Sequence, residues 1–281
     1  MIVMLDVNIQ TGEWPSQMEA IVGELHQLRE SNALLKKRQT EIDAQLSLAA
    51  RVQQSLAPRS LVWNDVSVET HYSPAHTIGG DFGIVFPHND EALTILMCDV
   101  SGHGIGSALM ANRIYSETLL QLERATTPRT LLRSLHEFAQ VRLATDGFYV
   151  TMAAVRFSMH GRRGTFVGGG HPPAMHVCNG GVRLLESQSG ILGCLSEFAR
   201  PASAEEIEFA SGDRLVLYTD GLVEVFDRLD NMLGVEGLET LVLQSAKRPL
   251  PEMRRTILEG VARWGHGSLG DDVSLVIVEV R

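Results

Sequence analysis

A mostly apolar series of residues between positions 17 and 56 recurs at alternating steps of three and four, without a slip. This spacing predicts one long helix over Gln17–Leu56 that carries a heptad seam. The seam has two kinds of position, d and a, occupied by Ile21, Leu28, Leu35, Ile42, Ala49 and Leu56 at d, and by Leu25, Asn32, Gln39, Leu46 and Gln53 at a.

Such a seam predicts a parallel homodimeric coiled coil, in which Asn32 fixes the register and Gln39 and Gln53 weaken the contact. The alternative is an amphipathic helix packed on its own domain, although the apolar stripe of such a helix is usually wider. Ala57-Pro58 predicts the end of the helix, because proline restricts the residue before it. The chain therefore divides into an unassigned segment (1–16), a coiled-coil and linker helix (17–58) and a second domain (59–281).

The second domain alternates between short β-branched segments and longer helical patterns. Strands and helices come in blocks instead of alternating strictly, which favours an α+β fold with mostly antiparallel sheets. We expect strands at Val66–Tyr72, Phe82–Phe86, Leu93–Val100, Phe148–Phe157, Thr165–Gly168, Val182–Leu185, Ile207–Phe209, Arg214–Tyr218 and Val273–Val280. We expect helices at Ile105–Glu123, Pro128–Leu143, Val235–Gln244 and Pro251–Trp264.

Charge and composition remove several functional classes. The net charge of −10 provides no basic field to attract nucleic acid or an acidic membrane surface. No apolar run approaches the roughly 20 residues of a membrane span. The three cysteines lie far apart and form no CxxC pair, which favours a reducing, cytoplasmic location over a disulfide scaffold or a zinc ribbon.

Four short acidic or glycine-rich motifs recur through the second domain: GGDF at 79–82, DVSGHG at 99–104, YTDG at 218–221 and GDDVS at 270–274. Three of them place an aspartate beside the end of an apolar strand. A carboxylate in such a position is costly unless a cation receives it, and no matching Lys or Arg stands nearby in the sequence. Ligation by oxygen alone favours Mg²⁺ or Mn²⁺ over zinc.

Together with GHPPA at 170–174, these motifs resemble those of the PPM-type, protein-phosphatase-2C-like phosphatases, in particular the bacterial RsbU/SpoIIE branch. The resemblance covers about Ala49 to Arg281. It implies a β-sandwich of two antiparallel sheets flanked by helices, with two metal ions per domain at one sandwich edge. Residue by residue, it implies metal ligation by the catalytic aspartates Asp81, Asp99, Asp220 and Asp271 and by the carbonyl of Val100.

The sequence departs from the family pattern at two positions. Ile84 stands where a further acid is common, which we expect to alter an outer metal or the substrate edge. Gly168 stands where asparagine is usual, which puts a local hydrogen bond in doubt. Three further roles are judged from the motifs: Asp272 is expected to support the site, Ser101 to be a turn residue because no base accompanies it, and a catalytic role for His103 is left open.

Three hypotheses follow. The first is a Mn²⁺- or Mg²⁺-dependent phosphoserine/phosphothreonine protein phosphatase, whose substrate, by resemblance, is an anti-sigma-factor antagonist of the STAS type. The second is a phosphatase-fold module that binds a partner with weak or no turnover. The third is a coiled-coil scaffold with a passenger domain, in which loss of residues 1–56 abolishes function while Asp220→Asn does not.

Overall fold

The computed structural model describes residues 14–55, 57–88, 91–102, 104–124, 127–142, 147–158, 162–194, 203–267 and 270–281. The chain separates into two compact units, Met1–Ala49 and Ala50–Arg281. This boundary lies after Ala49, whereas the sequence pattern predicts the end of the linker helix at residue 58. In the described parts of the chain, no helix is both long enough and apolar enough to cross a membrane.

Helix α1 (Trp14–Gln54) contains nearly all of the predicted long helix. It begins three residues before Gln17 and ends at Gln54, and Leu56 lies outside the described residues. The apolar seam residues of the first unit are about half exposed, since Ile21, Leu25 and Leu28 keep 52%, 49% and 59% of their surface accessible. Among the described residues of its own unit, therefore, nothing covers this seam.

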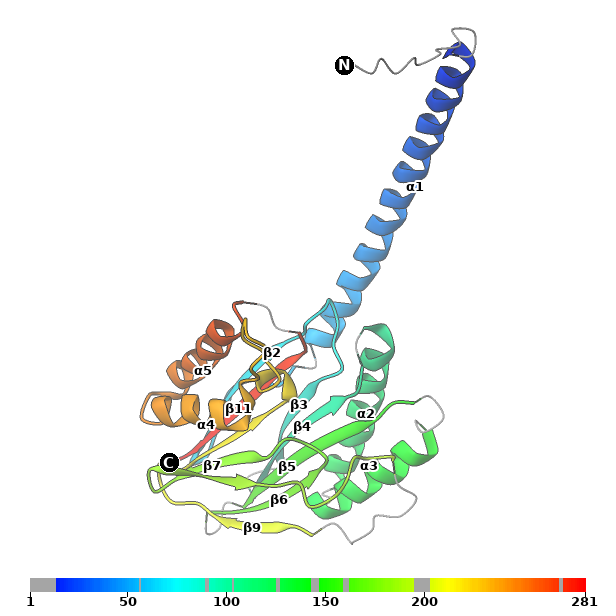
Figure 1. The fold of residues 1–281 in the computed structure, drawn as a ribbon. Helices are drawn as coiled ribbons and strands as arrows, with labels where there is room; N and C mark the ends of the chain where they lie inside the picture. Colours follow the sequence, from blue (N-terminus) through cyan, green and yellow to red (C-terminus); the bar gives the residue numbers. More distant parts are fainter. Residues whose placement is uncertain are drawn as a thin grey trace, which may run out of the picture. The chain divides into compact units, whose positions relative to one another are not determined.

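The second unit is a sandwich of two antiparallel sheets flanked by helices, as expected (Figure 1). The first sheet has the strand order β1-β2-β11-β10-β7-β8, with strands at Leu61–Trp63, Val66–Ser73, Val273–Val280, Arg214–Tyr218, Ala174–Cys178 and Gly181–Leu185 respectively. The second sheet has the order β3-β4-β5-β6-β9, with strands at Phe82–His88, Ala92–Val100, Val150–Ser158, Arg163–Gly169 and Glu205–Glu208.

Helices cover the outer face of each sheet, so that most central strands are buried on both faces. Helices α2 (Ile105–Glu123) and α3 (Pro128–Arg142) pack on the second sheet, and α4 (Gly234–Ser245) and α5 (Leu250–Trp264) on the first (Figure 1). In β10, for example, Leu215 and Leu217 face the core between the sheets while Val216 and Tyr218 face the helices. Burial on both sides explains why these strands read as continuous apolar runs.

Two strands were missed, β1 and β7. Strand β1 has only three residues, and β7 carries His176, a polar residue that is buried because its ring lies 3.1 Å from the Asp213 carboxylate. Neither strand offers a local pattern long enough to predict it. The Thr127 hydroxyl caps the start of α3, because it accepts a hydrogen bond from the Thr130 N–H at 3.2 Å.

Candidate metal centre

Antiparallel pairing brings the four acidic motifs to one edge of the sandwich. Asp99 is the penultimate residue of β4, and Asp81 directly precedes β3, which pairs with β4 through Phe82 and Cys98. Asp220 follows the end of β10, and Asp271 precedes the start of β11, its antiparallel neighbour. The end of one antiparallel strand and the start of the next lie at the same sheet edge.

Asp99 and Asp81 are the most strongly perturbed carboxylates of this group. Burial raises the pKa of Asp99 to about 7, helped by the charges of Asp220 and Asp271, while a hydrogen bond with Asp81 acts in the opposite sense. Burial also raises the pKa of Asp81 well above its ordinary value, and the charge of Asp99 adds to this effect. The two side chains therefore share one electrostatic environment.

Asp220 belongs to the same environment. Burial raises its pKa to about 6, and the charges of Asp271 and Glu224 act in the same direction. Among the ion pairs in the described parts of the chain, none involves Asp81, Asp99, Asp220 or Asp271. Carboxylates that are partly buried, mutually repelling and without a cationic side chain form a donor set suited to a hard divalent cation.

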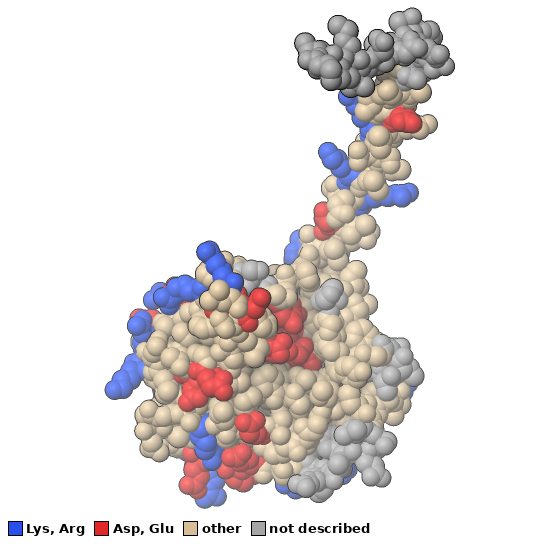
Figure 2. Space-filling view, in the orientation of Figure 1, with Lys and Arg blue, Asp and Glu red and all other residues tan. Residues whose placement is uncertain are grey.

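Figure 2 shows this distribution on one face of the domain. Acidic side chains gather in the upper middle of the domain, with Lys and Arg along its upper left rim, and near β9, at the bottom of the view, acidic and basic side chains alternate (Figure 2). Two ion pairs involve residues of β9: Arg163 lies 3.7 Å from Glu208, and Arg183 lies 3.2 Å from Glu205. None of the four aspartates has such a partner among the described residues.

The donor chemistry of the four aspartates fits a hard divalent cation, because all of their donor atoms are oxygens. Across the described ranges, no group of three or more His, Cys, Asp or Glu side chains has an arrangement that holds a metal ion.

Asp272 supports the loop that carries Asp81. Its carboxylate accepts hydrogen bonds from three backbone N–H groups, those of Ala75 at 2.8 Å, Gly80 at 2.6 Å and Asp81 at 3.4 Å. Asp272 is itself 7% exposed. The GGD loop is therefore fixed by a residue that lies 192 positions later in the sequence than Gly80. This agrees with the supporting role predicted for Asp272.

Glycines allow these loops to meet. A Cβ atom on Gly79 would lie 2.1 Å from Oδ2 of Asp272, and one on Gly80 would lie 2.4 Å from the carbonyl oxygen of Val100. Neither approach is possible for a side-chain carbon. The Val100 carbonyl, predicted as a backbone ligand, thus lies directly against the GGD motif.

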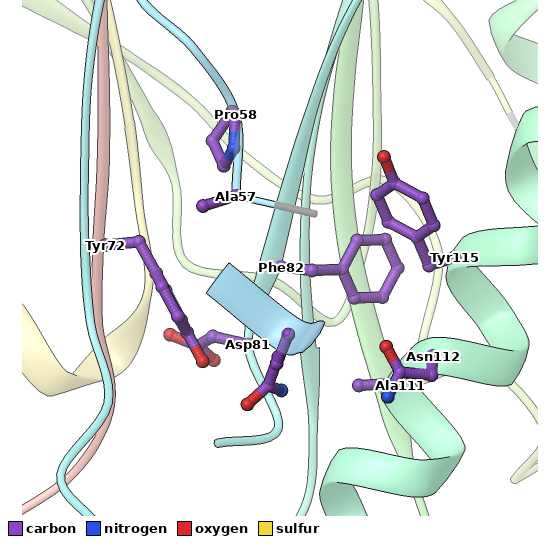
Figure 3. A pocket seen from close by; sticks show the side chains of 9 residues that line it. Ala57, Pro58, Tyr72, Asp81, Phe82, Ala111, Asn112 and Tyr115 are labelled. Atoms are coloured by element: carbon purple, nitrogen blue, oxygen red, sulfur yellow. The ribbon is translucent and has the colours of Figure 1, made fainter. Parts of the chain in front are cut away.

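A small pocket lies beside Asp81 (Figure 3). Tyr72 borders it on one side, and Phe82 and Tyr115 border it on the other (Figure 3). Gln53 also lines it, and its amide nitrogen donates to the carbonyl of Gly79 while its Oε1 accepts from the Gly79 N–H at 3.0 Å. Gln53 is 7% exposed, so its assignment to the coiled-coil seam is wrong. Its amide is engaged by the backbone of the GGD motif instead.

The two departures from the family pattern have structural explanations. Ile84 is buried in the core between the second sheet and its helices, so the expectation that it alters an outer metal or the substrate edge is wrong. A Cβ atom on Gly168 would lie 2.8 Å from the backbone of Ser187, which leaves no room for asparagine. Oε1 of Gln188 accepts the backbone N–H of Gly168 at 3.2 Å, a bond that does not depend on the side chain at this position.

The remaining motif residues have structural roles, or they lie outside the residues that the structure describes. Ser101 lies in a bend directly after β4, in agreement with the prediction of a turn, and its hydroxyl accepts the Tyr149 N–H at 2.9 Å. His171 is buried, its Nδ1 lies 2.8 Å from the Thr151 hydroxyl, and burial lowers its pKa to about 4. His103 lies outside the described residues. Sequence reasoning missed Gln53, Thr219 and Ser274, whose contacts join distant motifs.

Solved structures share this architecture. The SiaA-PP2C domain of Pseudomonas aeruginosa matches with a TM-score of 0.77 and 20% identity, covering 86% of this chain and 98% of that domain. The RsbU and RsbW domains of a Mycobacterium tuberculosis protein match with a TM-score of 0.70 and 21% identity, covering 80% and 62%. The fold is therefore that of the PP2C-type phosphatases.

A family model assigns the chain to one family among proteins with this fold. The model described as Stage II sporulation protein E (SpoIIE) matches residues 89–281, and the chain belongs to this family. A curated relative, the phosphoserine phosphatase RsbP of Bacillus subtilis (strain 168), is 24% identical over 184 residues. That match covers 64% of this chain and 45% of RsbP, so the chain spans less than half the length of this relative.

Proposed function

We propose that this protein is a metal-dependent serine/threonine protein phosphatase that hydrolyses phosphoserine and phosphothreonine. The observation that carries the proposal is the gathering of Asp81, Asp99, Asp220 and Asp271 at one edge of a PP2C-type fold, without an ion-pairing Lys or Arg in the described parts of the chain. The similarity to a phosphoserine phosphatase supports the reaction type.

The proposed cofactors are Mn²⁺ or Mg²⁺, two per domain. The side chains of the four aspartates and the carbonyl of Val100 would hold them, because hard cations prefer oxygen ligands. Solved proteins with a related fold support this choice, one being RsbX in complex with magnesium and another PstP with two manganese ions. When bound, such ions lower the pKa of a coordinated water and neutralise charge on a phosphoryl group.

The protein's own contribution is to hold these oxygens in place. Asp272 fixes the GGD loop through its backbone N–H groups, and the glycines let that loop approach Val100. The hydroxyl of Ser101 accepts a hydrogen bond from the Tyr149 N–H, and Ser101 is not proposed as a nucleophile. Hydrolysis by an activated water needs no covalent intermediate on the protein.

The proposal is tested by phosphate release from an aryl phosphate and from a phosphoserine protein, with and without Mn²⁺. Asp99→Asn is the control, with its folding checked by circular dichroism and the Mn²⁺ affinity of the wild type measured by calorimetry. We expect Mn²⁺-dependent turnover by the wild type and a loss of at least about a hundredfold in the variant. Wild-type turnover no faster than that of Asp99→Asn, with metal shown to be bound, refutes the proposal.

A second candidate function is a phosphatase-fold module that binds its partner without turnover. Metal affinity separates the two candidates. A binding module has no need for tight Mn²⁺ binding, whereas the phosphatase requires it.

We further propose a phosphorylated STAS-type anti-sigma-factor antagonist as substrate and a homodimer formed through residues 17–56, apart from Gln53. The curated similarity to RsbP supports a phosphoserine substrate but covers less than half of that protein. The exposed seam of α1 supports the dimer, since Leu35 and Ile42 are also 58% and 50% exposed. Burying the exposed half of such side chains contributes roughly 1 kcal/mol each.

A further inference from the structure

One oxygen of the Asp81 carboxylate is held by two hydroxyl groups from two other motifs. The Thr219 hydroxyl donates to Oδ2 of Asp81 at 2.6 Å, and the Ser274 hydroxyl donates to the same oxygen at 2.9 Å. Both donors are buried, with Thr219 at 0% and Ser274 at 2% exposure. Water therefore does not compete for these bonds, and Oδ2 is engaged by the protein itself.

The Thr219 hydroxyl is oriented by a third contact. It accepts a hydrogen bond from the Ser274 N–H at 3.1 Å. A hydroxyl has a single hydrogen, so accepting from Ser274 leaves that hydrogen free to point at Asp81. The other nearby acceptor, the carbonyl of Asp272, is farther away at 3.4 Å. Thr219 thus joins the end of β10, the start of β11 and the GGD loop through one oxygen atom.

We propose that Thr219 and Ser274 are positioning residues, which hold Oδ2 of Asp81 and thereby present Oδ1 to a metal ion. The inference rests on the proposed phosphatase function. Carboxylates that bind metals are usually hydrogen-bonded in turn, and removing that support typically costs 10–100-fold in metal affinity. Hydrogen bonds from a hydroxyl to a carboxylate are also short and strong, as the Thr219 bond is.

Thr219→Val tests this directly, because valine keeps the branched shape and removes only the hydroxyl. Thr219→Ser restores the hydroxyl and serves as the rescue. Thr118→Val is the matched control, since Thr118 is also fully buried and its hydroxyl is also bonded, to the Ile114 carbonyl at 2.7 Å in α2. Each variant is titrated with Mn²⁺ by calorimetry, and kcat and KM for an aryl phosphate are measured at several Mn²⁺ concentrations.

We expect Thr219→Val to raise the Kd for Mn²⁺ by about tenfold or more, while Thr219→Ser and Thr118→Val stay within about threefold of the wild type. We also expect kcat to recover as Mn²⁺ is increased, with KM for the aryl phosphate unchanged. If Thr219→Val fails to fold, Ser274→Ala takes its place, with an expected loss in the same direction.

An unchanged or tighter Mn²⁺ Kd in a folded variant lacking either hydroxyl overturns the inference and leaves the proposed phosphatase intact. A loss of affinity in Thr118→Val equal to that in Thr219→Val also overturns it, because the effect would then be general to buried hydroxyls. A wild type that binds no Mn²⁺ overturns the proposed function itself, and this inference with it.

Discussion

Replacing Asp272 by alanine is expected to destabilise the metal-free domain by about 3 kcal/mol. The carboxylate accepts two normal hydrogen bonds from backbone N–H groups, at 2.8 and 2.6 Å, and one long one at 3.4 Å. Each buried donor left without a partner costs about 1–3 kcal/mol. Ala75 is only partly buried, so water can reach its N–H, whereas Gly80 and Asp81 are buried.

Relief of repulsion offsets part of this cost, because the charge of Asp272 also acts on Asp81 and Asp99. For a domain of this size, about 3 kcal/mol corresponds to a fall in Tm of roughly 6–12 °C. The assay is thermal and urea unfolding in the presence of a chelator, followed by circular dichroism. Amide exchange at Gly80 and Asp81 should become faster in the same variant, which ties the loss to this loop.

Asp271→Ala is the matched control, since Asp271 is exposed and its carboxylate accepts, among the described residues, only the Asp272 N–H. We expect it to cost less than about 1 kcal/mol without metal. The stability of Asp272→Asn should lie between those of Asp272→Ala and the wild type. Its amide oxygen replaces one acceptor, while its NH₂ group faces another donor. A stability of Asp272→Ala within 1 kcal/mol of the wild type refutes the role of Asp272 as the anchor of the GGD loop.

Three further outcomes are expected. The metal-free domain should lose stability as pH rises from about 4 to 7, because the pKa values of Asp99 (about 7) and Asp220 (about 6) lie above the ordinary 3.8, so the native state binds more protons than the unfolded state. Gly80→Ala should cost about 1–3 kcal/mol, because its Cβ would press on the Val100 carbonyl. Leu28→Glu should dissociate the proposed dimer in sedimentation equilibrium, because it places a charge in the helical seam.

Each of these has a control. Asp99→Asn should make the free energy of unfolding depend less on pH. The contribution of His171, whose lowered pKa acts in the opposite direction, should stay unchanged. An unaltered dependence of stability on pH would contradict its assignment to Asp99. Gly23→Ala, where a Cβ meets nothing within 4 Å, should not destabilise the protein, and equal losses in both glycine variants would argue against a steric cause. Leu34→Glu, exposed but outside the seam, should keep the wild-type oligomeric state.

Local patterns predicted the strands and helices that have strong local signals. Ile105–Glu123, Arg214–Tyr218 and Val273–Val280 have the predicted bounds, because each is a run of periodic or continuous apolar residues flanked by glycine or charged turns. Strand β7 was missed, since the burial of His176 depends on Asp213, which no pattern near residue 176 reveals.

In the candidate site, too, local motifs were predicted from the sequence and contacts between distant residues were not. The aspartates were predicted from their motifs, but the hydroxyls that hold Asp81 come from positions 138 and 193 residues away. Gln53 was assigned to the seam because heptad spacing continues through it, whereas its partner Gly79 lies outside the helix. Sequence spacing predicts which residues share a face, and it does not predict which distant backbone group a polar side chain will meet.

The place of β11 has a consequence for how the protein is made. This strand lies between β2 and β10, and Asp272 beside it binds Gly80 from 192 residues away. Contacts of such long range form late in folding, because the intervening chain must first be brought together. A nascent chain that has not yet released β11 from the ribosome has a gap in its first sheet and an unsupported Asp81. The acidic edge is therefore completed only when Asp272 and β11 are available to bind the GGD loop and to pair with β2 and β10.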